Sequence, residues 1–335
     1  MSDTAAGAGT GARQLALLIA GIAAGGGSGL AFPRLGDVVE PGIWLALGML
    51  LYTEFTQVRL SATVRTVSRS RRFVITSLAG NFVLVPLAVA ALAILLPSDT
   101  AIRLGALMVL LVPCTDWFVT FTRLGRGDPA LAVGTVPTLL FLQFLLLPAY
   151  LWLLLGKDFT GVVSPGPFAR AFLLLIVLPF AAALLTRRAA AGNATGQRWL
   201  DVTEHLSSPL LAVTLFLVAA SQASLLEGVA GELGRAVIVF ALYAAIAAPL
   251  AWLVASIARL GLREARTLAF NFGTRNSFVV LPLALALPEG WELTAAVVVL
   301  QSVVELAAVM VYLWWVPRWL LRDKPAVSST TWRIE

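Results

Sequence analysis

The sequence predicts an all-α membrane protein with ten transmembrane helices, and three observations support this fold class. Hydrophobic residues make up 59% of the 335 residues, charged residues only 13%, and the mean hydropathy is +0.89. Soluble domains are usually about 45–50% apolar and about 25% charged. Apolar runs long enough to cross a bilayer recur along the chain, and no soluble domain fits between them. The basic residues cluster in the short connecting loops, so the net charge of +6 does not indicate a nucleic-acid partner.

Ten apolar runs of about 20 residues can be assigned as spans of the lipid bilayer. The first five are predicted at 13–32, 39–56, 73–96, 102–122 and 129–155. The second five are predicted at 168–186, 208–226, 235–258, 264–287 and 292–316. The predicted organisation is a disordered cytoplasmic tail over 1–12, five-helix repeats over 13–155 and 156–320, and a cytoplasmic tail over 321–335.

The distribution of arginine predicts the orientation of these spans. Arginines concentrate in the loop 57–72 and in alternate loops after it, whereas the loop 288–292 is acidic. Because basic loops stay on the cytoplasmic side, both termini of this multi-pass protein are expected in the cytoplasm. The expected location is the plasma membrane. Five spans per half force the halves into opposite orientations, which is the arrangement of inverted-repeat transporters.

The fourth span of each half is interrupted by polar residues. In span 102–122 the interrupting residues are Pro113, Cys114, Thr115 and Asp116. In span 264–287 the interruption is NFGTRNS, which contains Thr274, Arg275, Asn276 and Ser277. Paired interruptions at matching positions are the best sequence indication of a binding site near the bilayer midplane. We therefore expect two broken helices that cross and form a solute site.

Asp116, Arg275 and Glu305 are the ionisable residues predicted to lie deepest in the bilayer. Each costs roughly 2.5–3.5 kcal/mol at a helix centre on insertion scales, so each needs a partner or water. Asp116 and Arg275 would meet if the helices cross, either as a structural ion pair or in contact with a solute or proton. Glu305 has no basic residue in its own span, which favours a coupling or binding role over a structural hydrogen bond.

Cys114 and His205 are the only cysteine and the only histidine of the chain. One cysteine cannot form an intramolecular disulfide, and with His205 in a predicted loop no metal site and no cofactor are expected. An intramembrane enzyme would need a nucleophile with a positioned base, which Cys114 lacks, so the chain is not expected to be an enzyme. Cys114 is then either a buried bystander or a single soft contact for a solute.

Asn81 and Gln143 are further polar residues inside spans. Interhelical hydrogen bonds explain both residues, and contact with a solute is the alternative. The glycine-rich segment 21–29 in the first span predicts close packing against another helix, with or without movement between them.

Several short segments give the chain a family resemblance. They are SLAGNFVLVPLAVAALAILLP with Asn81 and Pro86, Tyr52 and Val58-Arg59, Cys114, LGRGD over 124–128, Gln143 and Pro148, and Val304-Glu305. With them the chain resembles the arsenite efflux permeases of the bile acid:sodium symporter superfamily, over essentially all ten spans. The resemblance implies proton-coupled export of arsenite, and often antimonite, with the cysteine and the tenth-helix glutamate both required. It also implies a moving panel formed by spans 1 and 6 with adjacent helices.

The chemistry of arsenite fits the residues that carry this resemblance. Arsenite at neutral pH is mostly an uncharged trihydroxide, and a single thiolate is a soft ligand that holds it weakly. The resemblance implies Cys114 as solute contact and Glu305 as proton-exchanging carboxyl, and we expect Thr115 and Asn276 to line the same site. Asp116 and Arg275 are expected as a charge pair at the crossover. The expected supporting polar residues are Asn81, Gln143, Thr274 and Ser277.

Two residues depart from the family pattern. Pro113 stands where the family commonly has a basic residue, and the stretch Thr274 to Val279 has Arg275 but no carboxylate. A guanidinium at the crossover would repel a sodium ion bound there. The alternative function is transport of a small organic anion, with Arg275 as clamp for its carboxylate or sulfonate and Cys114 incidental.

Overall fold

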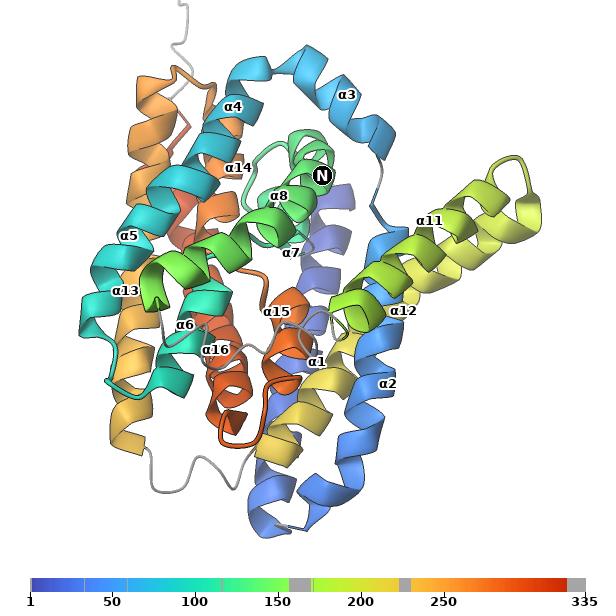
Figure 1. Ribbon diagram of the computed structural model, residues 1–335. Coiled ribbons are helices and arrows are strands. Elements are labelled where there is room, and N and C mark those ends of the chain that lie inside the picture. Colours follow the sequence, from blue (N-terminus) through green and yellow to red (C-terminus); the bar gives the residue numbers. More distant parts are fainter. Residues whose placement is uncertain are drawn as a thin grey trace, which may run out of the picture.

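The computed structural model describes residues 2–32, 34–58, 60–115, 117–156, 170, 172–222 and 230–323. Every regular element within these ranges is a helix, so the predicted all-α class is confirmed (Figure 1). Five of the described helices are long and apolar enough to cross a membrane: Arg71–Leu95, Pro129–Leu155, Ala194–Ser221, Gly231–Ile257 and Glu292–Leu320. The ten-span inverted repeat and the orientation of the termini stay predictions. Parts of predicted spans 168–186 and 208–226 lie outside the described residues.

Four helices pack on one another on the right of Figure 1, and we call them the panel. They are α1 (Ser2–Ala31), α2 (Leu35–Thr56), α11 (Leu178–Ala190) with its π-helical start η3 (Leu173–Val177), and α12 (Ala194–Gln222). A Cβ built at Gly25 would lie 2.2 Å from the carbonyl oxygen of Phe216, so glycine permits the close approach of α1 to α12 that the sequence predicts. Hydroxyl pairs join α2 to α11 and to α12. The distance is 2.9 Å between Tyr52 and Thr186 of α11, and 2.9 Å between Thr56 and Thr203 of α12.

Most of the remaining helices form a second body, which we call the core group. The main hydrophobic core runs through it and extends into the panel, where it includes Leu47, Ala183 and Val218. One continuous segment consists of α4 (Arg71–Ala79), the π-helical turn η1 (Gly80–Leu84), α5 (Val85–Leu92) and η2 (Ala93–Leu95). The others are α6 (Thr100–Leu110), α7 (Trp117–Leu124), α8 (Pro129–Leu155), α13 (Ala230–Ile257), α14 (Leu262–Gly273), α15 (Ser277–Leu285), and α16 (Glu292–Trp315) with η5 (Val316–Leu320). A smaller apolar cluster, which includes Leu18, Leu211 and Leu306, joins the panel to α16.

Short polar side chains begin four helices of the core group. Asp99 accepts a hydrogen bond from the backbone N–H of Ile102 and begins α6, and Ser70 does the same for α4 through Phe73. Asp128 accepts from two N–H groups at the start of α8. Asn276 accepts from the N–H of Val279 at the start of α15. These side chains satisfy donors that have no partner within the helix, so each helix begins at a defined residue.

Two predicted loops are helical in the structure. The loop 57–72 contains α3 (Leu60–Arg69), a short amphipathic helix in which valines and arginines recur at helical spacing. The helix α12 begins at Ala194, so His205 lies exposed on a helix and the predicted loop around it is wrong. Hydropathy detects only the apolar part of a helix that continues beyond the bilayer. The helix α1 includes residues 2–12, and only 321–323 of the predicted C-terminal tail are described.

Candidate functional site

The two interrupted helices of the sequence meet at their breaks. The first break separates α6 from α7, and the second separates α14 from α15. Pro113 and Arg275 pair across them as an antiparallel bridge. The N–H of Cys114 donates to Thr274 O at 3.2 Å, and the N–H of Asn276 donates to Val112 O at 2.9 Å. These bonds satisfy backbone groups that a broken helix would otherwise leave without partners in an apolar environment.

Cys114 lies inside this crossover and is 3% exposed. Its neighbour Thr115 is held by the second break, because the amide nitrogen Nδ2 of Asn276 donates to Thr115 Oγ1 at 2.8 Å. The same Asn276 side chain begins α15 through its oxygen. The structure therefore brings together three of the four predicted solute-binding residues, Cys114, Thr115 and Asn276.

Glu305, the fourth predicted solute-binding residue, reaches the crossover from α16. Its Oε2 accepts from the backbone N–H of Arg275 at 2.8 Å and from Nε2 of Gln301 at 2.8 Å. Gln301 in turn accepts from the hydroxyl of Ser277 at 2.7 Å. Gln301 was not predicted, although its position one helical turn before Glu305 was a usable signal. The carboxylate is thus bound both to its own helix and to the second break.

Arg275 is 2% exposed and directs its guanidinium into the core group. The guanidinium donates to five oxygens: Thr274 O (2.7 Å), Asn271 O (2.8 Å), Phe272 O (3.0 Å), Asn81 Oδ1 (3.1 Å) and Leu110 O (3.4 Å). Its carbon Cζ lies 5.5 Å from the centre of the Tyr243 ring, at cation–π distance. Tyr243 was not predicted, because nothing in the sequence of α13 sets it apart. Asp116 lies outside the described residues, as does Arg59, so the predicted Asp116–Arg275 pair stays a prediction.

The two predicted supporting amides differ in their surroundings. Asn81 is fully buried in the π-helical turn and bonds across to Asn271 of α14, in agreement with the interhelical role expected for it. Gln143 is 1% exposed, yet neither amide atom has a hydrogen-bond partner within the described part of the chain. The expected interhelical bond of Gln143 is therefore not present among these residues. Its neighbours on the same face of α8, including Leu139 and Leu147, are buried and apolar, which explains the lack of a partner.

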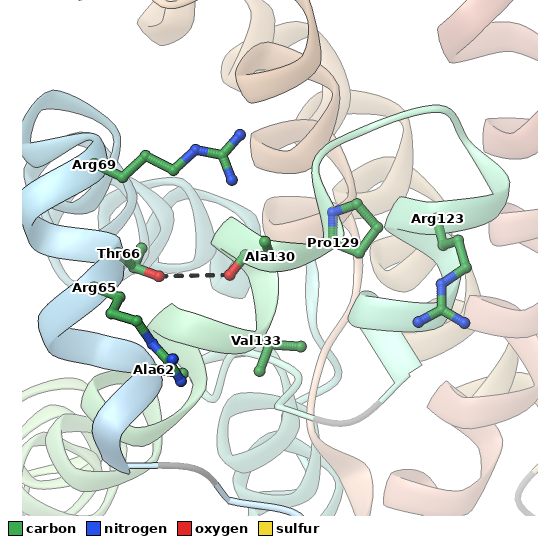
Figure 2. Close-up of a pocket in the computed structure, with 8 residues that line it drawn as sticks. All are labelled: Ala62, Arg65, Thr66, Arg69, Arg123, Pro129, Ala130 and Val133. Atoms are coloured by element: carbon green, nitrogen blue, oxygen red, sulfur yellow. Dashed lines mark hydrogen bonds between the residues drawn. The ribbon is translucent and has the colours of Figure 1, made fainter.

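A pocket of about 500 Å³ lies where α3, the end of α7 and the start of α8 meet (Figure 2). None of the crossover residues lines it. Arg65 and Arg69 of α3 and Arg123 of α7 contribute its charged groups. Thr66 donates to Ala130 O at 3.4 Å and Arg69 pairs with Asp128 at 2.8 Å, so both contacts join α3 to the start of α8.

Comparison with known families identifies the class of protein. The chain matches the model of the Sodium Bile acid symporter family over residues 44–228, which is more than half of its length. The chain belongs to this family. Members of the sodium bile acid symporter family are transporters and not enzymes, so this chain carries small solutes or ions across a lipid bilayer. A search of curated proteins found none that matches.

The family match covers only one side of the crossover in this symporter-family chain. It includes the first break with Cys114, whereas Arg275 and Glu305 lie beyond residue 228. The family match therefore concerns the first part of the chain. It gives no information on Arg275 and Glu305, whose surroundings are known from the geometry of the crossover.

Proposed function

We propose that this transporter exports arsenite, or antimonite, across the plasma membrane in exchange for protons. Cys114 is the soft contact for the solute, and Glu305 is the carboxyl that exchanges the proton. One observation carries the proposal: a single peptide group, between Thr274 and Arg275, holds both residues. Its carbonyl accepts from the N–H of Cys114, and its N–H donates to Glu305.

The thiol step is reversible and needs no further reagent. The thiol of Cys114 displaces one hydroxyl of the uncharged trihydroxide as water, and one arsenic–sulfur bond forms. Water reverses the step and restores the thiol. A single soft ligand holds the metalloid weakly enough for release. The hydroxyl of Thr115 and the amide of Asn276 lie at the same crossover and supply polar groups for the remaining hydroxyls of the solute.

Glu305 stands where the core group meets the panel, which suits a coupling residue. The next residue, Leu306, packs in the small cluster that joins α16 to α1, α2 and α12. A proton taken up by the carboxyl changes its bond to the Arg275 N–H, and the change reaches both the break that holds Cys114 and the panel contact. Alternating access then follows from movement of the panel against the core group.

The alternative solute is a small organic anion clamped by Arg275. Such a clamp needs a guanidinium that faces the solute. The five acceptor oxygens that already engage the Arg275 guanidinium weigh against this alternative.

Arsenite uptake into everted vesicles tests the proposal. Uptake is compared between vesicles with an acidic interior and vesicles without a pH gradient. We expect gradient-driven uptake by the wild type, loss of uptake in Cys114→Ser, and loss of the gradient dependence in Glu305→Gln. Ser302→Ala is the matched control on α16, since its hydroxyl bonds to Val298 of the same helix. Uptake that survives Cys114→Ser unchanged contradicts the thiol mechanism. Thermal stabilisation of the purified protein by an organic acid but not by arsenite favours the alternative.

A further inference from the structure

The oxygens around Arg275 are of the kind that would bind a free cation. Three of them, on Leu110, Asn271 and Phe272, belong to the last turns of α6 and α14, next to the points where these helices break. Such helix ends carry partial negative charge, and in inverted-repeat transporters they coordinate the coupling sodium ion. The carbonyl of Thr274 and the side-chain oxygen of Asn81 complete the set.

A sodium ion does not fit this arrangement, because the guanidinium already engages these oxygens. A second positive charge at hydrogen-bonding distance in a buried site would be repelled. The surroundings also hold the guanidinium in place: Tyr243 lies against it, and Asn81 is itself bonded to Ser77 and Asn271. Guanidinium stays protonated at every physiological pH, so the positive charge at this site is not lost by release of a proton.

We infer that Arg275 is a tethered cation that replaces an exchangeable sodium ion in this member of the sodium bile acid symporter family. Its transport cycle is then independent of sodium. The inference concerns the ion and holds for either solute, the metalloid or the organic anion. Removal of the Arg275 side chain should expose the five oxygens and create a sodium site that the wild type lacks.

Thermal unfolding of the purified protein tests this, in sodium chloride and in choline chloride at equal ionic strength. The wild type should unfold at the same temperature in both salts. Arg275→Ala should unfold several degrees lower in choline chloride and recover part of that loss in sodium chloride. Arg275→Lys, which keeps a tethered cation, should remain insensitive to sodium.

Arg266 provides a control, because it is also 2% exposed and also donates to backbone carbonyls, those of Arg126, Pro317 and Leu321; unlike Arg275 it also pairs with a carboxylate, that of Asp323, which is 58% exposed. Arg266→Ala should lose stability equally in both salts. Sodium-specific stabilisation of the wild type would overturn the inference, even if Arg275→Ala fails to fold. Equal destabilisation of Arg275→Ala in both salts would also overturn it. Neither readout involves arsenite, so failure here is separate from failure of the proposed function.

A second inference rests on the arginine-lined pocket and is independent of the crossover. Figure 2 shows Arg65 and Arg69 on α3 and Arg123 on α7, with the first turn of α8 between the two helices. The charge of Arg69 is paired with Asp128. The guanidinium groups of Arg65 and Arg123 form no ion pair with the residues that the structure describes. The pocket therefore carries an excess of positive charge.

The helix that supplies two of these arginines is built like a helix that lies on a membrane surface. Val64 and Val67 of α3 are 72% and 40% exposed, next to arginines on the same short helix. Amphipathic helices of this kind place apolar side chains toward acyl chains and basic side chains toward headgroups. Basic pockets between transmembrane helices bind phosphate-bearing headgroups, and guanidinium matches phosphate geometry.

We propose that this pocket binds a phosphate group, carried either by an anionic phospholipid or by a soluble phosphate.

Native mass spectrometry and thermal unfolding distinguish the two sources, with phosphatidylglycerol, phosphatidylcholine and inorganic phosphate as separate probes. The double variant Arg65→Gln/Arg123→Gln should bind several-fold more weakly than the wild type whichever of these probes the wild type binds. Arg188→Gln/Arg198→Gln is the control, since both arginines are exposed and lie outside the pocket. Selective binding of phosphatidylglycerol identifies the lipid as the source, and stabilisation by inorganic phosphate alone identifies a soluble anion. Equal binding of all three probes by the wild type and the pocket variant overturns the proposal.

Discussion

The backbone N–H of Cys114 and the carboxylate of Glu305 are bonded to opposite ends of one peptide group, the one that joins Thr274 to Arg275. A peptide group is planar and rigid, so displacement of one end moves the other. Three segments are linked in this way: the break after α6, the break after α14, and the helix α16. Substitutions at the contacts that support this link and the packing around it should therefore have measurable effects.

Gln301→Leu should destabilise the protein and impair transport. The substitution removes the donor to Glu305 and the acceptor of the Ser277 hydroxyl, and it leaves that buried hydroxyl without its partner. An unsatisfied buried group costs about 1–3 kcal/mol. Equilibrium unfolding in mixed micelles measures the loss. Ser302→Ala, on the next residue, is the control, and equal stability of the two variants would show that the Gln301 bonds contribute nothing.

Tyr243→Phe and Tyr243→Leu should differ in their effects. The hydroxyl of Tyr243 donates to Phe272 O at 2.7 Å, and the ring lies against the Arg275 guanidinium. Phenylalanine removes only the hydrogen bond, for a loss of about 0.5–1.5 kcal/mol. Leucine also removes the cation–π contact, which is worth up to about 2 kcal/mol when desolvated. Unfolding of both variants under one set of conditions measures the difference, and identical losses would mean that the ring does not stabilise Arg275.

Gly25→Ala should destabilise the packing of α1 on α12, whereas Gly26→Ala should not. A Cβ at Gly25 would meet the backbone of Phe216 at 2.2 Å, and backbone cannot rotate away as a side chain can. Overpacking of this kind costs about 1–3 kcal/mol. Nothing lies within 4 Å of a Cβ at Gly26, and alanine is the better helix former there by about 1 kcal/mol. Thermal unfolding should rank the variants in this order, and the reverse order would place the α1–α12 contact elsewhere.

Asp128→Ala should weaken the start of α8, and Asp128→Asn should largely preserve it. Loss of the capping oxygen costs about 0.5–2 kcal/mol, whereas asparagine retains an acceptor for the N–H groups of Ala130 and Leu131. The ion pair with Arg69 adds little, because Arg69 is 59% exposed and solvent screens the pair. The stability loss of Asp128→Asn relative to the wild type should therefore be small and should change little with salt. A strong salt dependence would mean that the ion pair, and not the cap, is what matters.

Much of the fold could be predicted from the sequence, and less of the site. Runs of apolar residues identify most helices. Breaks were predicted at Pro113 to Asp116 and at Asn271 to Ser277, because a run of polar residues inside a span is costly in lipid and marks an interrupted helix. Both breaks are present among the described residues, but the second is shorter than predicted, since α14 continues to Gly273 and α15 begins at Ser277. The short helix α3 was missed because its arginines made it look like a loop. Gln143 was expected to bond between helices, yet among the described residues it has no partner, since apolar residues share its face.

The helical class, the membrane environment and the approximate positions of two helix breaks follow from the sequence alone. They do so because the bilayer imposes a length and a polarity that each segment must meet on its own. The binding partners of the polar residues, in contrast, became visible once the helices were placed in three dimensions. Asn81, Leu110 and Glu305 reach the second break from separate helices, and the Arg275 side chain meets Asn81 across 194 residues of sequence. Such partners depend on how helices are placed against one another, which no local pattern of residues encodes.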